Sequence, residues 1–136
     1  MKAEALAALE ARCFQGAKTW TAAQYQSFPD QPGALLITQV GGFISGRVIA
    51  DEAEVITICV APESRQQGTG TALLDEFEDT ARKRGASKIF LEVAQTNTAA
   101  RALYTRFGYT ETGRRKSYYQ TAGNPPIDAL ILQKLV

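Results

Sequence analysis

The sequence contains no histidine in its 136 residues, and this absence excludes several kinds of active site. Catalytic triads that use histidine as the base cannot form, and most zinc sites also lose a ligand that they need. Carboxylates, tyrosine hydroxyls and main-chain groups remain to carry out any chemistry. The sequence therefore predicts a site without a metal ion.

Cysteine is scarce and neither sign of charge dominates. Cys13 and Cys59 are the two cysteines and have no CxxC spacing, which predicts reduced thiols in a cytoplasmic protein.

A formal net charge of +1 gives no electrostatic reason to bind nucleic acid or a membrane. No apolar run reaches the length of a membrane span, and Glu4 and Glu10 interrupt the first segment, unlike a signal peptide. We expect a cytoplasmic monomer that binds neither nucleic acid nor a membrane.

The pattern of apolar residues predicts an α+β fold in one domain, residues 1–136, with no internal repeat or linker. Helices are expected near residues 2–14, 21–28, 71–84 and 97–107. Strands are expected at residues 34–39, 43–50 and 55–60, at 87–94, and in a closing hairpin with a turn at 121–126. This order predicts a mixed central sheet flanked by helices. It consists of an antiparallel meander, a β-α-β-α centre and a C-terminal hairpin.

A glycine pair lies between the third strand and the following helix, in the stretch VAPESRQQGTGTALL. Gly68 and Gly70 lack a Cβ, so several amides of this loop can face an anion at the positive end of the helix. A P-loop would need GxxxxGK[ST], but Thr71 follows the second glycine directly. A dinucleotide site would need GxGxxG, but Leu73 stands where the third glycine belongs.

The remaining pattern, RxxGxG, resembles the acyl-CoA pyrophosphate loop of the GNAT superfamily of N-acetyltransferases. The resemblance implies a GNAT-type acyl-CoA N-acyltransferase fold, acetyl-CoA as co-substrate, and a third strand that splays from its neighbour. Many relatives carry a basic residue where this chain has Thr71. The residues that the resemblance assigns to the cofactor are Ile58, Cys59 and Val60 of the strand, and Arg65, Gln66, Gln67, Gly68, Thr69, Gly70 and Thr71 of the loop.

Three polar residues follow at regular positions in the next strand and helix. Glu92 alternates with apolar residues of the strand, so its side chain faces away from theirs. Asn97 and Tyr104 are seven residues apart, two helical turns, and can face one cleft. Each has a simpler interpretation: Glu92 as a surface residue, Asn97 as a helix cap and Tyr104 as a core ring.

Taken together, the pattern LEVxxxNxxAxxLYxxxGY is similar to that of the bacterial ribosomal-protein-alanine N-acetyltransferases, a branch of the GNAT enzymes. The tail, from GRRKSYYQ to DALIL, agrees with that family. The resemblance implies that Glu92 is the general base, that Tyr104 is the general acid, and that Asn97 holds the cofactor or the substrate. The resemblance also implies that the acceptor is a protein N-terminus, the N-terminal alanine of a small-subunit ribosomal protein. The residues expected to line its groove are Phe14, Trp20, Tyr118 and Tyr119.

Other functions stay open at this point. The same chemistry could acetylate a small amine, a lysine side chain or other protein N-termini, and a non-catalytic acyl-CoA-binding module would belong to another class altogether. An acyl-enzyme could form on Cys59, although no histidine is present to activate this thiol. The basic run at residues 114–116 is either a solvated face or a contact for an acidic partner.

Overall fold

The computed structural model of the chain describes residues 1–15, 17–120 and 123–136. Its α-helices are α1 (Ala3–Cys13), α2 (Ala22–Ser27), α3 (Thr69–Lys83) and α4 (Thr98–Arg106). Its strands are β1 (Ala34–Gln39), β2 (Gly42–Ile49), β3 (Glu52–Val60), β4 (Lys88–Ala94), β5 (Thr110–Tyr119) and β6 (Ile127–Leu135). Short 3₁₀ turns at Phe28–Asp30 and Pro62–Ser64 follow α2 and β3. The order of elements predicted from the sequence is confirmed.

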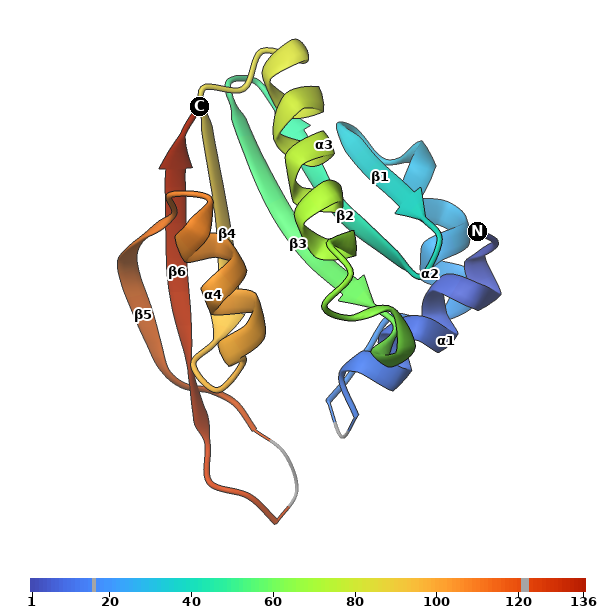
Figure 1. Ribbon diagram of the computed structural model, residues 1–136, viewed down its shortest axis with the longest axis vertical. Helices are drawn as coiled ribbons and strands as arrows, with labels where there is room; N and C mark the ends of the chain where they lie inside the picture. Colours follow the sequence, from blue (N-terminus) through green and yellow to red (C-terminus); the bar gives the residue numbers. More distant parts are fainter. Residues whose placement is uncertain (16, 121–122) are drawn as a thin grey trace.

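The strands form one mixed sheet in the order β1-β2-β3-β4-β6-β5 (Figure 1). The first three strands make an antiparallel meander, and β4 runs parallel to β3. Strand β6 is antiparallel to both β4 and β5. Helix α3 provides the crossover that a parallel pair requires. The predicted meander, β-α-β-α centre and closing hairpin are therefore confirmed.

Strands β3 and β4 pair along only part of their length. The ladder runs from Glu52 opposite Lys88 to Val55 opposite Leu91, and in the described residues it continues no further. Beyond Val55 the two strands diverge (Figure 1). The residues of β3 that follow, 56–60, have no strand partner on that side. The predicted splay is confirmed, and it places an open strand edge in the middle of the sheet.

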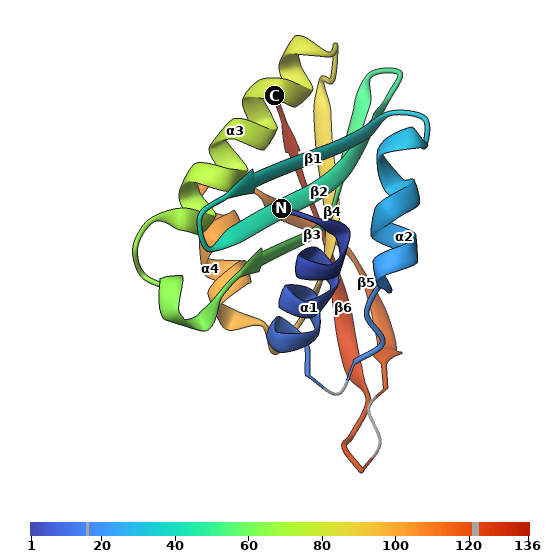
Figure 2. The same ribbon diagram turned by 90° about the vertical axis from the view of Figure 1, so that its right-hand side faces the viewer.

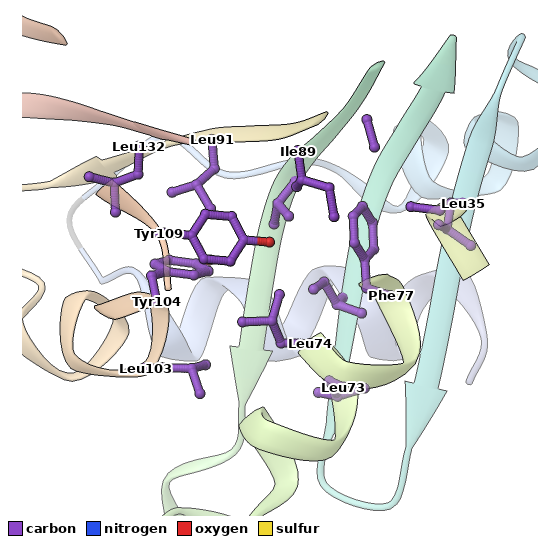
Figure 3. Close-up of a cluster of buried hydrophobic side chains, with 14 of the residues drawn as sticks. Leu35, Leu73, Leu74, Phe77, Ile89, Leu91, Leu103, Tyr104, Tyr109 and Leu132 are labelled. Atoms are coloured by element: carbon purple, nitrogen blue, oxygen red, sulfur yellow. The ribbon is translucent and has the colours of Figure 1, made fainter. Parts of the chain in front are cut away.

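Helices cover both faces of the sheet: α3 and α4 lie over one face, α1 and α2 over the other (Figure 2). On the first face, Phe77 of α3 is fully buried together with Ile89 and Leu91 of β4 (Figure 3). Gly46 of β2 admits this ring, because a Cβ there would lie 2.5 Å from Phe77 Cε2. Burial of a side chain of this size stabilises the fold by about 1.5–3 kcal/mol.

The opposite face is packed by the N-terminal helices. Leu6 and Leu9 of α1 and Tyr25 of α2 contact Phe43 of β2 and Cys59 of β3 in one buried cluster. This second cluster, which we call the α1–α2 cluster, fixes α1 and α2 against strands β2 and β3.

Local signals in the sequence account for the ends of the helices. Thr21 and Gln24 form a capping box at the start of α2, with Gln24 N–H donating to Thr21 Oγ1 at 3.2 Å. Asn97 caps α4 by accepting the N–H of Ala100 at 3.3 Å. Gly85 and Gly108 follow α3 and α4 with positive φ, as expected for residues that end helices.

One predicted turn differs in the structure, and another lies partly outside the described residues. The turn expected at residues 51–54 is shorter, because β3 already begins at Glu52. The charged residues of this stretch alternate with the buried Ala53 and Val55, which is a strand pattern. In the turn expected at 121–126, Thr121 and Ala122 lie outside the described residues.

Candidate active site

The loop before α3 presents unpaired main-chain N–H groups. Gln66 and Gly68 have positive φ values of 62° and 80°, and Gly68 is the N-cap of α3. Within the described residues, the N–H groups of residues 66–71 donate to no acceptor, and Ala72 N–H is the first to bond, to Gly68 O at 2.9 Å. Such amides at a helix N-terminus bind anions. The loop therefore fits the pyrophosphate that the resemblance implies.

Two side chains of the predicted motif stabilise the loop itself. Arg65 Nε donates to the Val60 carbonyl oxygen at 3.2 Å, and Gln67 Nε2 donates to the Glu63 carbonyl oxygen at 3.2 Å. Glu63 also forms an ion pair with Arg12 of α1, at 2.7 Å. These contacts hold the loop against β3 and α1.

The open edge of β3 carries main-chain groups that face the gap. Ala61 N–H donates to Gly41 O on the β2 side at 2.7 Å. Since N–H groups alternate in direction along a strand, the N–H of Val60 points to the other edge, where β4 has diverged. An N–H group in this orientation is available to donate to a ligand that lies along the open edge.

A cavity of about 470 Å³ lies on the side of the sheet that carries Glu92. Its volume is within the range of small-ligand sites. It is lined by Trp20, Glu54, Val55, Ile56, Glu92, Arg115, Tyr118 and Tyr119, and we call it the acceptor pocket. Four residues proposed from the sequence thus meet here: Trp20, Glu92, Tyr118 and Tyr119. Phe14 is not among its lining residues and packs instead against the α1–α2 cluster.

Glu92 faces this pocket, away from the core. Its neighbours Leu91 and Val93 are buried on the other face of β4, whereas the Glu92 side chain is 28% exposed. Glu92 Oε1 lies 2.9 Å from Arg115 Nε, and the Arg115 guanidinium lies 5.3 Å from the centre of the Tyr118 ring. The basic run at 114–116 thus contacts acidic residues of its own chain, since Arg114 also pairs with Asp128 at 3.3 Å.

Tyr104 lies on the opposite side of the sheet, in the core beneath α4 (Figure 3). Its side chain is 3% exposed, and its ring centre is 5.5 Å from that of Tyr109. Burial raises the pKa of the Tyr104 hydroxyl, which therefore keeps its proton at neutral pH. Asn97 uses its side-chain oxygen as the cap of α4, so its side-chain NH₂ group remains to contact a ligand.

The two cysteines lie close together, which the sequence did not indicate. Cys13 is half-buried at the end of α1, and its thiol donates to the Val60 carbonyl oxygen at 3.4 Å. Cys59 is 1% exposed in the α1–α2 cluster. A contact with Cys13 and burial both raise the pKa of the Cys59 thiol, which argues against an acyl-enzyme on Cys59.

Sequence reasoning missed several residues of the acceptor pocket. Glu54 and Arg115 line it beside Glu92, together with Val55 and Ile56. The alternation of Glu54 with the buried Ala53 and Val55 was a signal, since it is the same pattern that singled out Glu92. The described residues contain no group of three or more carboxylate or thiol side chains placed to hold a metal ion. None of the described helices is both long and apolar enough to cross a membrane.

Comparison with known proteins adds to this geometry. The chain is 38% identical over 94 residues to the ribosomal protein bS18-alanine N-acetyltransferase of Escherichia coli (strain K12). That alignment covers 69% of this chain and 63% of the relative, so the chain spans less than two thirds of the relative's length. It is also 35% identical over 130 residues to the N-alpha-acetyltransferase RimI of Mycobacterium tuberculosis, covering 89% of this chain and 80% of that protein.

The fold matches a solved structure over most of its length. The crystal structure of the ribosomal-protein-S18-alanine N-acetyltransferase from Escherichia coli superposes with a TM-score of 0.77 and 33% identity, over 95% of this chain and 86% of that one. The model of the acetyltransferase (GNAT) family matches residues 3–109. With its splayed central strands and its amide-lined loop, the chain belongs to the GNAT acetyltransferase family.

Proposed function

We propose that the chain transfers the acetyl group of acetyl-CoA to the N-terminal α-amine of a protein. The observation that carries this proposal is the position of Glu92 in the acceptor pocket, on the strand β4 that diverges from β3, with the protonated Tyr104 on the opposite face of the sheet. The names of the bacterial relatives support an acceptor of one kind, the N-terminal alanine of a small-subunit ribosomal protein.

Bound acetyl-CoA would supply the acetyl group as a thioester. The free N–H groups of residues 66–71 would hold its pyrophosphate, and the open edge of β3 would hydrogen-bond its amide-containing arm. Asn97 would donate to the same arm through its side-chain NH₂ group. The residues present fit this ligand, because the loop N–H groups bond no acceptor among the described residues and residues 56–60 have no strand partner on the open side.

Transfer then needs a neutral amine, a polarised carbonyl and a protonated leaving sulfur. Glu92 would take the proton of the amine, directly or through a water molecule. Val60 N–H would donate to the carbonyl oxygen of the donor, and the Tyr104 hydroxyl would give its proton to the sulfur. The Tyr104 hydroxyl carries the proton that this role needs, since burial raises its pKa above the ordinary value for tyrosine.

The choice of an α-amine rests on the chemistry of a site without histidine. An α-amine has a pKa of about 8 and lysine about 10.4, so deprotonation of lysine is about 3.3 kcal/mol harder. A carboxylate base is better matched to the easier proton. The aromatic walls formed by Trp20, Tyr118 and Tyr119 supply apolar surface for the first residues of a peptide.

The test is a panel of short peptides that differ at residue one, each incubated with acetyl-CoA and the protein. We expect acetylation of the α-amine, fastest for N-terminal alanine, and none on a peptide whose α-amine is blocked but which contains lysine. Activity on free small amines alone would contradict the proposal. Tight binding of acetyl-CoA without turnover of any acceptor would indicate a binding module instead.

A further inference from the structure

The arginine of the loop motif does not supply positive charge to the loop amides. Arg65 turns back toward β3, where its Nε bonds the Val60 carbonyl oxygen. Residues 66–71 include no charged side chain. A pyrophosphate held there would carry about two negative charges opposite neutral N–H groups, so any cation near the loop has to come from another element.

Helix α4 places an arginine at this point. Arg106 Nη2 donates to Thr71 Oγ1 at 3.2 Å, in the first turn of α3. One helical turn earlier, Leu103 packs against the same turn of α3, since a Cβ on Gly70 would lie 3.4 Å from Leu103 Cδ2. The contact is therefore part of the way in which α4 meets α3.

The guanidinium is not neutralised by a carboxylate of the described residues, and both Arg106 and Thr71 are exposed. A threonine hydroxyl that accepts from arginine keeps its own proton to donate. Arg106 and Thr71 thus offer two further donors next to the unpaired amides. Arginine matches phosphate oxygens better than lysine does, because its planar donors bind them in pairs.

We propose that Arg106 is a phosphate-binding residue that donates to the pyrophosphate of coenzyme A, with Thr71 orienting its guanidinium. The proposal rests on acetyl-CoA being the co-substrate, as argued above. It also explains how this chain functions with threonine after the second glycine: the positive charge comes from α4, 35 positions further along the chain.

The test compares Arg106→Gln with Arg101→Gln, a matched control on the same helix whose guanidinium bonds Gln95 O at 2.9 Å. The dissociation constant of coenzyme A is measured by calorimetry for both variants and the unmodified chain. We expect Arg106→Gln to weaken binding about tenfold, Arg106→Lys to weaken it less, and Arg101→Gln to leave it unchanged. In turnover, KM for acetyl-CoA rises in Arg106→Gln while kcat at saturation stays the same.

Two further ligands show which phosphate group of coenzyme A Arg106 contacts. Dephospho-CoA lacks the 3′-phosphate, and pantetheine lacks all phosphates. We expect Arg106→Gln to lose the same factor with dephospho-CoA as with coenzyme A, and to lose nothing with pantetheine. A loss with coenzyme A but not with dephospho-CoA would assign Arg106 to the 3′-phosphate and overturn the proposal. Unchanged binding in Arg106→Gln would also overturn it, and would leave the proposed activity intact.

The unmodified chain separates this proposal from the proposed function. If the unmodified chain fails to bind coenzyme A, the proposed function itself fails, and the assignment of Arg106 fails with it. Unfolding midpoints of the variants serve as a check on folding, and we expect no change because both arginines are exposed or half-exposed.

Discussion

Glu92 and Tyr104 lie on opposite faces of one sheet. Glu92 projects from β4 into the acceptor pocket, and the Tyr104 side chain projects from α4 into the core on the other face. If the two residues act as proposed, the sheet separates the proton acceptor from the proton donor. In the proposed reaction the amine enters from one face and the sulfur leaves on the other.

Glu92→Gln should lower kcat by about 10²-fold while leaving the affinity for acetyl-CoA unchanged, because general bases contribute rate enhancements of this order. The measurement is steady-state turnover of the preferred peptide, with binding followed by calorimetry. Glu54→Gln is the comparison, since Glu54 lines the same pocket. A large loss in Glu54→Gln with normal turnover in Glu92→Gln would move the base to Glu54.

Tyr104→Phe should slow the chemical step, because it removes only the hydroxyl that would donate a proton to the sulfur in the proposed reaction. Single-turnover kinetics with preformed enzyme and acetyl-CoA measure this step directly. Tyr109→Phe is the matched control: its ring lies 5.5 Å from that of Tyr104, in the same core. Equal single-turnover rates in both variants would remove Tyr104 from the reaction.

Gly68→Ala should weaken acetyl-CoA binding, because φ of +80° is strained for alanine and a shift of the loop would misplace its amides. Gly85→Ala provides the control. Gly85 also has a positive φ, of +97°, and a Cβ at either glycine would find nothing within 4 Å. Both variants should lose about 1 kcal/mol of folding stability. Only Gly68→Ala should raise KM for acetyl-CoA, and a similar rise in Gly85→Ala would contradict this.

Tyr118→Ala should raise KM for the peptide several-fold and leave KM for acetyl-CoA unchanged. Its side chain is 50% exposed in the acceptor pocket, so little stability is lost with it. Ile49→Ala is the control, because Ile49 is similarly exposed but does not line this pocket. Initial rates over a matrix of both substrates separate the two KM values.

Folding stability should fall steeply above pH 10. Burial raises the pKa of Tyr25, Tyr104 and Tyr109 above their ordinary value of 10.0. Their contribution is fully present below pH 10 and is lost as the pH rises toward the higher folded-state pKa values. Each tyrosine that stays protonated in the folded state lowers stability by about 1.4 kcal/mol per pH unit in this window. Urea unfolding from pH 8 to 11 measures the slope, which should be shallower in Tyr109→Phe.

The fold and half of the site follow from short-range patterns. Thr21 with Gln24, and Asn97 with Ala100, are caps between residues three apart, and the alternation around Glu92 is visible within one strand. Such signals survive in a single sequence because the groups involved are neighbours along the chain. The glycine loop is a pattern of the same kind.

The remaining contacts join distant segments and leave no local signal. Arg106 meets Thr71 across 35 positions, and the Cys13 thiol meets the Val60 carbonyl across 47. The ion pair of Glu92 with Arg115 depends on the order in which β4, β6 and β5 line up in the sheet. Phe14 was expected in the acceptor pocket with Trp20, but it packs against the cluster formed by α1 and α2 instead.

The short β3–β4 ladder also has a consequence for how the protein behaves in a concentrated solution. Past Val55, β3 has no strand partner on that side, and an unpaired strand edge of this kind can pair with strands of other molecules. A ligand lying along that edge would shield it. We therefore expect the protein to aggregate more slowly during storage when coenzyme A is present, and static light scattering over several days, with and without the ligand, would record the difference.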